Sequence, residues 1–182
     1  IDQTKLPYEF EKVVLNSWKD VQHAIATMMV RGAPLIGITG AWGMVLAIKD
    51  NPTDAFIHQV RSELISTRPT AVDLQWGVDS IVKVVMGVAE RERFVVALKK
   101  AEEMTQANVL ANRAIGTHGA KLIAELYAKK RTPVNILTHC NAGWLATVDY
   151  GTALSAVYSA FEQGIPVHVW VDETRPRNQG LL

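Results

Sequence analysis

The sequence predicts an α/β protein, in which a mostly helical N-terminal domain (residues 1–130) precedes the first βαβ part of a parallel-sheet domain (residues 131–182). Apolar residues recur at helical spacing through most of the first 130 positions. After Thr132-Pro133, a short apolar run, a helical stretch and a run of alternating valines follow within about 40 residues. A strand, a helix and a strand in that space form a βαβ unit, which requires parallel strands.

The first elements are predicted to be a strand and two helices. Residues 6–15 mix aromatic and branched residues with charges, as an exposed edge strand does. Ser17 and Asp20 have capping-box spacing before a first helix. Pro34 suits the first turn of a second helix. The small residues of this second helix are Gly37, Gly40, Ala41, Gly43 and Ala47. Each glycine costs a helix about 1 kcal/mol relative to alanine. A compensating interaction is therefore expected, namely close approach of another helix or of a ligand.

Further helices complete the first domain. Apolar positions between Phe56 and Leu64 mark a third helix, and those between Leu74 and Val85 mark a fourth. Residues 94–129 predict one or two helices, broken or tightly packed near Gly116 and Gly119.

The βαβ unit has three predicted parts. Residues 134–139 read as a buried strand, and residues 151–163 as a helix with Gly164 at its C-terminal cap. The alternation of Val167, Val169 and Val171 with polar and aromatic residues gives the second strand.

Composition excludes several classes of protein. The chain has 182 residues, 48% of them hydrophobic, with 19 Lys and Arg against 18 Asp and Glu. This balance disfavours a nucleic-acid partner or a membrane surface, and no apolar run is long enough to span a bilayer. One cysteine cannot form an internal disulfide, which favours a reducing, cytoplasmic location. The chain begins at Ile1 without a visible secretory signal and reads as part of a longer protein.

Two polar clusters follow the two predicted strands, residues 138–143 and residues 172–180. Ligands of open parallel sheets bind beyond the carboxyl ends of strands, so the clusters are predicted to converge on one crevice. Cys140 is either a reactive thiol or a small buried hydrophobe. His139 points to the opposite face of an extended strand, which argues against a Cys–His dyad. The turn from Asn141 to Gly143 either offers amides to an anion or only connects two elements.

Arginines in three separate loops point to a localised anion site. Arg31 precedes the small-residue helix, Arg68 precedes the fourth helix, and Arg175 and Arg177 follow the second strand. Each of these three arginine-containing segments is also compatible with an ordinary surface loop that binds no anion. The histidines lack metal-ligand spacing, so no metal is predicted.

Five ordered motifs resemble the methylthioribose-1-phosphate isomerase family, whose superfamily includes the regulatory subunits of translation initiation factor 2B. The motifs are Val30–Gly37, Arg68–Ala71, Asn112–Gly119, Thr138–Gly143 and Glu173–Gly180. The likeness implies a helical domain followed by a Rossmann-like domain. It implies an aldose–ketose isomerase of methionine salvage, a homodimer that acts on a sugar phosphate without metal or nucleotide cofactor.

The resemblance also implies roles for residues of this sequence. Cys140 corresponds to the catalytic cysteine of the family. The residues expected to contact substrate are Arg31, Gly32, Ala33, Arg68, Asn141, Gly143 and Gln179.

Two features depart from the family pattern. The family's catalytic aspartate and an Asn-Lys pair lie beyond Leu182, so these residues alone are expected to be inactive, with the remaining half supplied by the full-length protein or by a second chain. Trp144 stands where the family usually has a small residue. The alternative functions are a non-catalytic subunit related to initiation factor 2B, which generally lacks the pairing of Cys140 with Gln179, and a ribose-1,5-bisphosphate isomerase.

Overall fold

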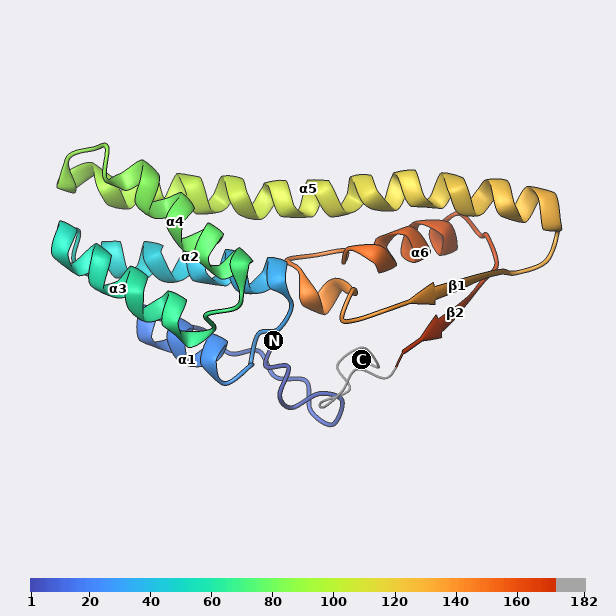
Figure 1. Cartoon of the computed structure of the whole chain (residues 1–182), viewed down its shortest axis with the longest axis horizontal. Helices are drawn as coiled ribbons and strands as arrows, with labels where there is room; N and C mark the ends of the chain where they lie inside the picture. Colours follow the sequence, from blue (N-terminus) through green and yellow to red (C-terminus); the bar gives the residue numbers. More distant parts are fainter. Residues whose placement is uncertain (173–182) are drawn as a thin grey trace. The chain divides into compact units, whose positions relative to one another are not determined.

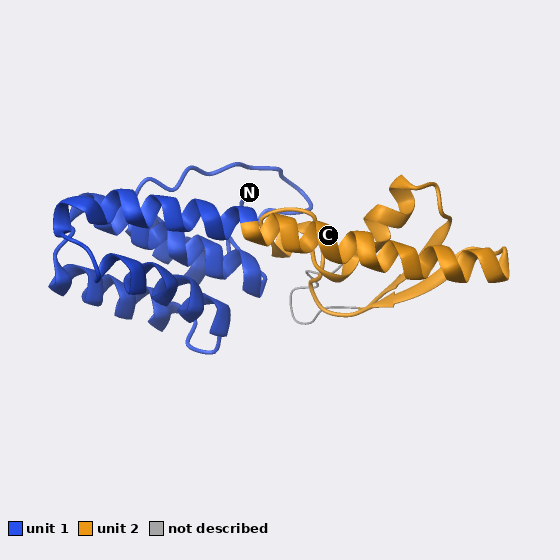
Figure 2. Cartoon of the chain, turned by 90° about the horizontal axis from the view of Figure 1, so that it is seen from above, with its two compact units in different colours: residues 1–106 blue, residues 107–182 orange. Residues whose placement is uncertain are grey.

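The chain is described by a computed structural model over residues 1–172, and it divides into two compact units (Figures 1 and 2). The first unit is Ile1–Gln106 and the second is Ala107–Leu182. The division falls within one long helix, α5 (Glu90–Lys130). The domain boundary predicted after residue 130 is not tested by this division and stays a prediction.

The first unit is helical, as the sequence predicts. It holds four helices besides the first part of α5: α1 (Trp18–Ala26), α2 (Ala33–Asp50), α3 (Asp54–Thr67) and α4 (Val72–Val85). Their core is formed by large aliphatic side chains that are less than 2% exposed. The largest of these are Ile25, Met44, Ile48, Ile57, Leu64, Leu74 and Ile81.

The predicted capping box at the start of α1 is confirmed. The Ser17 hydroxyl accepts a hydrogen bond from the Asp20 amide at 3.2 Å, and the Asp20 carboxylate accepts one from the Ser17 amide at 2.9 Å. The Asn16 amide and the Ser17 side chain donate to this carboxylate and lower the pKa of Asp20. The short Asp side chain therefore closes the box as Glu does elsewhere.

The glycines in the first half of α2 are explained by contact with α4. A Cβ atom on Gly77 would lie 2.1 Å from the Gly37 carbonyl oxygen, and one on Gly37 would lie 2.6 Å from the Asp73 carbonyl oxygen. At Gly40 the obstacle would be the Leu74 side chain, at 2.5 Å. Of the two explanations drawn from the sequence, close approach of another helix is therefore the one observed.

The strand predicted for residues 6–15 is wrong. The segment forms turns followed by irregular backbone, and the Asp2 amide bonds the Glu11 carbonyl without a ladder beside it. Tyr8 and Val14 are 93% and 76% exposed. Aromatic and branched residues favour a strand only when a partner strand supplies hydrogen bonds, and in the described residues none pairs with this segment.

The second unit contains the predicted βαβ arrangement. β1 (Val134–Thr138) pairs in parallel with β2 (Val167–Val171), and η1 (Trp144–Ala146) and α6 (Ala153–Glu162) connect them. α6 begins two residues later than predicted because Tyr150 and Gly151 both have left-handed backbones, with φ of 69° and 70°. Gly164, with φ of 72°, follows the cap residue of α6.

α5 is one uninterrupted helix of 41 residues. The tight packing predicted near its glycines is confirmed, and the break is not. A Cβ on Gly116 would lie 2.6 Å from the Ser159 hydroxyl, and one on Gly119 would lie 2.4 Å from the Ala156 methyl group. Both neighbours belong to α6. Neither α5 nor any other helix of residues 1–172 is both long and apolar enough to cross a membrane.

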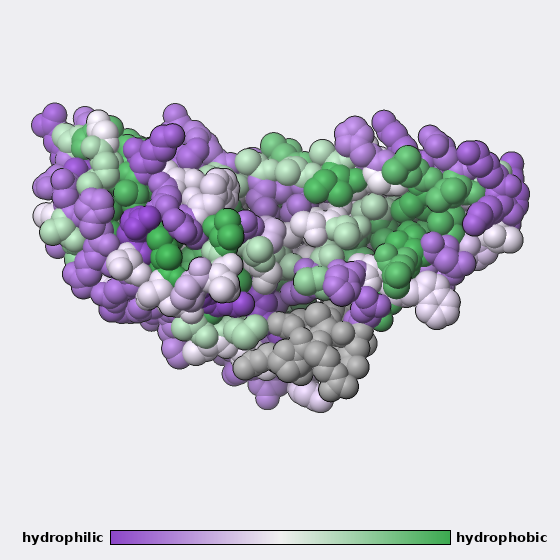
Figure 3. Space-filling view, in the orientation of Figure 1, coloured by the Kyte–Doolittle hydropathy of each residue, from purple (hydrophilic) through white to green (hydrophobic). Residues whose placement is uncertain are grey.

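The two faces of the β1–β2 sheet differ. Inward side chains such as Val134 and Ile136 pack with Ala120, Ile123 and Ala160 of the two helices. On the outward face, Leu137 and Trp170 are paired in register and are 73% and 57% exposed. Phe161 on α6 is also exposed, and Figure 3 shows hydrophobic surface over α6 and β1.

Candidate active site

The loop after β1 carries three of the candidate residues. Cys140, the chain's only cysteine, is exposed, and its backbone is left-handed with φ of 66°. Asn141 and Gly143 follow it and are half-buried. Residues with a Cβ seldom adopt this φ, and such conformations cluster at functional sites. In this structure the Cys140 side chain is open to solvent, which favours the reactive thiol over the buried hydrophobe.

The far end of this loop is fixed to the start of α6. The Ala142 carbonyl accepts hydrogen bonds from the amides of Thr152 and Leu154, at 3.1 and 3.3 Å. Gly151 lies directly against the loop, since a Cβ there would be 2.8 Å from the Gly143 carbonyl carbon. A side chain at 151 would thus displace the turn that follows Cys140.

The two strand ends are adjacent, as the sequence predicts. His139 follows β1 and Asp172 follows β2, and the imidazole Nδ1 lies 2.8 Å from a carboxylate oxygen of Asp172. The rest of the second polar cluster, residues 173–180, lies outside the described residues, and so does Gln179.

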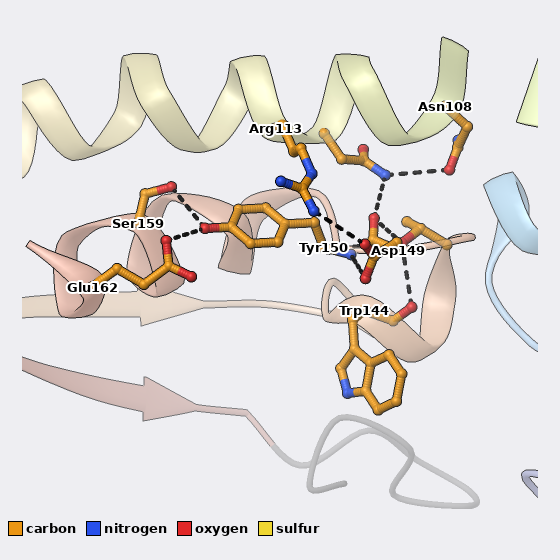
Figure 4. Close-up of polar contacts among 10 residues, drawn as sticks. Asn108, Arg113, Trp144, Asp149, Tyr150, Ser159 and Glu162 are labelled. Carbon is orange, nitrogen blue, oxygen red and sulfur yellow. Dashed lines mark hydrogen bonds and ion pairs between the residues drawn. The ribbon is translucent and has the colours of Figure 1, made fainter. Parts of the chain in front are cut away.

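Two asparagines that the sequence analysis did not assign to the site support the loop from α5 (Figure 4). Asn112 is 3% exposed, and its amide nitrogen donates to the Asp149 carbonyl at 3.1 Å and to Asn108 Oδ1 at 3.3 Å. Asn108 Oδ1 also accepts from the Val148 amide at 3.2 Å. The signal for this pair is its spacing of four residues, which places both amides on one helix face.

A second polar group lies beside this support (Figure 4). The Tyr150 hydroxyl donates to the Glu162 carboxylate at 2.7 Å and lies 3.2 Å from the Ser159 hydroxyl. Ser159 lowers the pKa of Tyr150, but the Glu162 carboxylate and burial raise it by more, so the net direction is upward. Arg113 lies over the Tyr150 ring at 5.3 Å and 3.6 Å from the Asp149 carboxylate.

We expect Asn112→Ala to destabilise the second unit by about 2 kcal/mol, because the substitution removes the buried amide that donates to both the Asp149 carbonyl and Asn108 Oδ1. Urea denaturation followed by circular dichroism measures this change. Lys121→Ala, at an exposed position of the same helix, is the control and should change stability by less than about 0.5 kcal/mol. Equal stability of the two variants would contradict the supporting role.

In the first unit, the candidate residues at the start of α2 are Arg31, Gly32 and Ala33. Arg31 is 5% exposed and donates from Nη2 to the Gln3 carbonyl at 2.8 Å. Gly32 is the N-cap of α2, and its φ of 99° requires glycine. Ala33 is the first residue of the helix. Their expected contact with substrate stays a prediction.

Arg68 is the cap residue at the end of α3 and is half-buried. Its Nη1 atom is buried and has no hydrogen-bond partner among residues 1–172. An unpaired buried guanidinium nitrogen is costly unless a ligand accepts its hydrogen bond, which fits the predicted phosphate contact. No group of three His, Cys, Asp or Glu side chains in the described part of the chain is placed to hold a metal ion.

Residues 29–182 match the model of the initiation factor 2 subunit family. The chain belongs to the initiation factor 2 subunit family. Among curated members, it is 52% identical over 180 residues to the methylthioribose-1-phosphate isomerase of Methylorubrum populi, covering 99% of this chain and 49% of that protein. The chain thus spans about half the length of the curated relatives it matches.

Two solved structures of the family share this fold. The 5-methylthioribose 1-phosphate isomerase from Pyrococcus horikoshii has a TM-score of 0.85 at 35% identity, covering 99% of this chain and 51% of that one. The translation initiation factor eIF-2B subunit delta from A. fulgidus has a TM-score of 0.82 at 37% identity, covering 98% of this chain and 53% of that one. The fold therefore places the chain in the family but does not separate an isomerase from an initiation-factor subunit.

Proposed function

We propose that the intact protein carrying this chain isomerises 5-methylthioribose 1-phosphate to 5-methylthioribulose 1-phosphate. The observation that carries the proposal is the 52% identity, over 99% of the chain, to a protein named as that isomerase. The exposed Cys140 at the carboxyl end of β1 supports it, because ligands of parallel sheets bind at that edge.

The reaction moves one hydrogen within the sugar. The phosphate on C1 prevents simple opening to a free aldehyde, so the bond between C1 and the ring oxygen must break as hydrogen passes from C2 to C1. The C2 hydroxyl becomes a carbonyl, and its proton goes to the released ring oxygen. The hydrogen moves from C2 to C1 either through a paired acid and base in a pocket from which water is excluded or as a hydride shift.

Cys140 is proposed as a proton carrier or a stabiliser of the transition state. Arg31, Arg68 and the amides between Asn141 and Gly143 are proposed to hold the phosphate, and Gln179 a sugar hydroxyl. In line with the resemblance to the isomerases, the catalytic aspartate is proposed to lie outside residues 1–182, since the relatives are about twice as long. We therefore propose that the active species contains a further segment of about this length, and that it is a homodimer.

A non-catalytic subunit is the second candidate, because the A. fulgidus subunit matches the fold about as well as the isomerase does. A third candidate is a ribose-1,5-bisphosphate isomerase, whose substrate differs from 5-methylthioribose 1-phosphate in the substituent at C5. Comparing turnover of the two sugar phosphates by the intact protein distinguishes the three candidates. The main proposal predicts turnover of 5-methylthioribose 1-phosphate, and the third candidate predicts turnover of ribose 1,5-bisphosphate. Turnover of neither favours the non-catalytic subunit.

Arg68→Met tests the proposed phosphate contact. The substitution keeps the length of the side chain and removes its donors, so KM should rise about tenfold while the helices stay folded. Arg91→Met, at an exposed position near the start of α5, is the matched control and should leave KM unchanged. An unchanged KM in Arg68→Met would remove Arg68 from the site.

A further inference from the structure

The imidazole of His139 and the carboxylate of Asp172 extend the pairing of the two strands by one step. The parallel register ends with Thr138 opposite Val171, and the next residue of each strand belongs to this pair. The backbone ladder stops here, and a side-chain hydrogen bond of 2.8 Å takes its place. Because a carboxylate only accepts hydrogen bonds, Nδ1 of His139 is the donor.

The next residue, Cys140, has the left-handed backbone described above. Such a conformation persists in a residue with a side chain only where the surroundings determine it. On the far side of Cys140, the carbonyl of Ala142 is held by two amides at the start of α6. Only Cys140 and Asn141 therefore lie between two anchored points, and His139 is one of them.

We propose that the hydrogen bond from His139 to Asp172 clamps the loop that carries Cys140 to the end of β2 and so positions the Cys140 thiol for the isomerase reaction. The inference rests on the function proposed above, in which Cys140 acts on the substrate. His139 and Asp172 are positioning residues, since their part in the reaction is exerted through the loop.

The solvent exposure of the His139–Asp172 pair determines which properties of the protein should change when the hydrogen bond is removed. The side chains of His139 and Asp172 are 86% and 46% exposed, and exposed pairs contribute little to global stability. Removal of the clamp should therefore loosen residues 139–141 without unfolding the sheet. A local change with unchanged global stability separates positioning from a general structural role.

The test compares Asp172→Ala with Asp172→Asn in the intact protein. Alanine removes the acceptor, whereas the asparagine amide oxygen can still accept from Nδ1. His118→Ala, an exposed histidine on α5, is the control. Hydrogen exchange of the backbone amides and the kinetics with 5-methylthioribose 1-phosphate are measured on each variant, and urea denaturation reports global stability.

In Asp172→Ala, the exchange rates of the Cys140 and Asn141 amides should rise about fivefold, and kcat should fall about fivefold. Fivefold is the factor for one lost hydrogen bond. Exchange in β1, KM and the urea midpoint should stay unchanged. In Asp172→Asn, both quantities should return to within about twofold of the wild type.

Unchanged exchange in Asp172→Ala would overturn the clamp. Faster exchange with unchanged kcat would overturn its positioning role. If the wild type does not turn over 5-methylthioribose 1-phosphate, the proposed function fails, and exchange alone then decides the clamp.

Discussion

Gly77→Ala should destabilise the first unit by about 3 kcal/mol, at the upper end of the range for an overfilled core. The added methyl group would lie 2.1 Å from the carbonyl oxygen of Gly37, and this obstacle is backbone. A flexible side chain can turn away from such a contact, but a carbonyl in a helix cannot. α2 and α4 must therefore move apart and lose contact along their length. Urea denaturation followed by circular dichroism measures the loss.

Gly87→Ala is the matched control for this substitution. Gly87 lies in the turn after α4, and an added Cβ would lie 3.9 Å from the Val84 carbonyl oxygen, an ordinary van der Waals distance. The free energy of unfolding should change by less than about 0.5 kcal/mol, or rise because alanine restricts the unfolded chain. A Gly77→Ala protein as stable as this control would show that α2 and α4 are not in the close contact described.

Cys140→Ser should lower kcat of the intact protein at least about 100-fold, the smallest effect typical of a lost proton-transfer group. Serine keeps the shape of the side chain and replaces a thiol by a hydroxyl that holds its proton far more tightly. The fold should be unaffected, because the side chain is exposed. Steady-state kinetics with 5-methylthioribose 1-phosphate measure the change.

Two controls accompany the Cys140 substitution. Ser62→Ala, at an exposed position of α3, should leave kcat unchanged. Iodoacetamide should inactivate the wild type in proportion to the modification of Cys140, since these 182 residues hold no other cysteine. Full activity of either the serine variant or the Cys140-alkylated wild type would remove Cys140 from the mechanism.

Local pattern was sufficient to predict most elements of the fold. The four helices of the first unit and the two strands follow from apolar spacing, and the capping box of α1 follows from two residues. The failure at residues 6–15 has a physical cause. A strand is defined by its partner, and composition alone does not reveal whether one is present.

The site was predictable only in part. Cys140 and the neighbouring strand ends follow from the position of polar residues after β1 and β2. The hydrogen bond by which Asn112 supports the loop does not follow from the sequence pattern, because Asn112 and Asp149 are 37 positions apart in the sequence. The left-handed backbone of Cys140 could not be predicted from the sequence either, because glycine is the residue that indicates such a conformation and Cys140 is not a glycine.

The central claim is that Cys140 serves an isomerase reaction on a sugar phosphate. Phosphorus NMR of the intact protein with 5-methylthioribose 1-phosphate tests it most directly, because the aldose phosphate and the ketose phosphate give separate signals. We expect the wild type to convert the first into the second and Cys140→Ser to leave the substrate unchanged over the same period. No conversion by the wild type, or equal conversion by both proteins, would contradict the account.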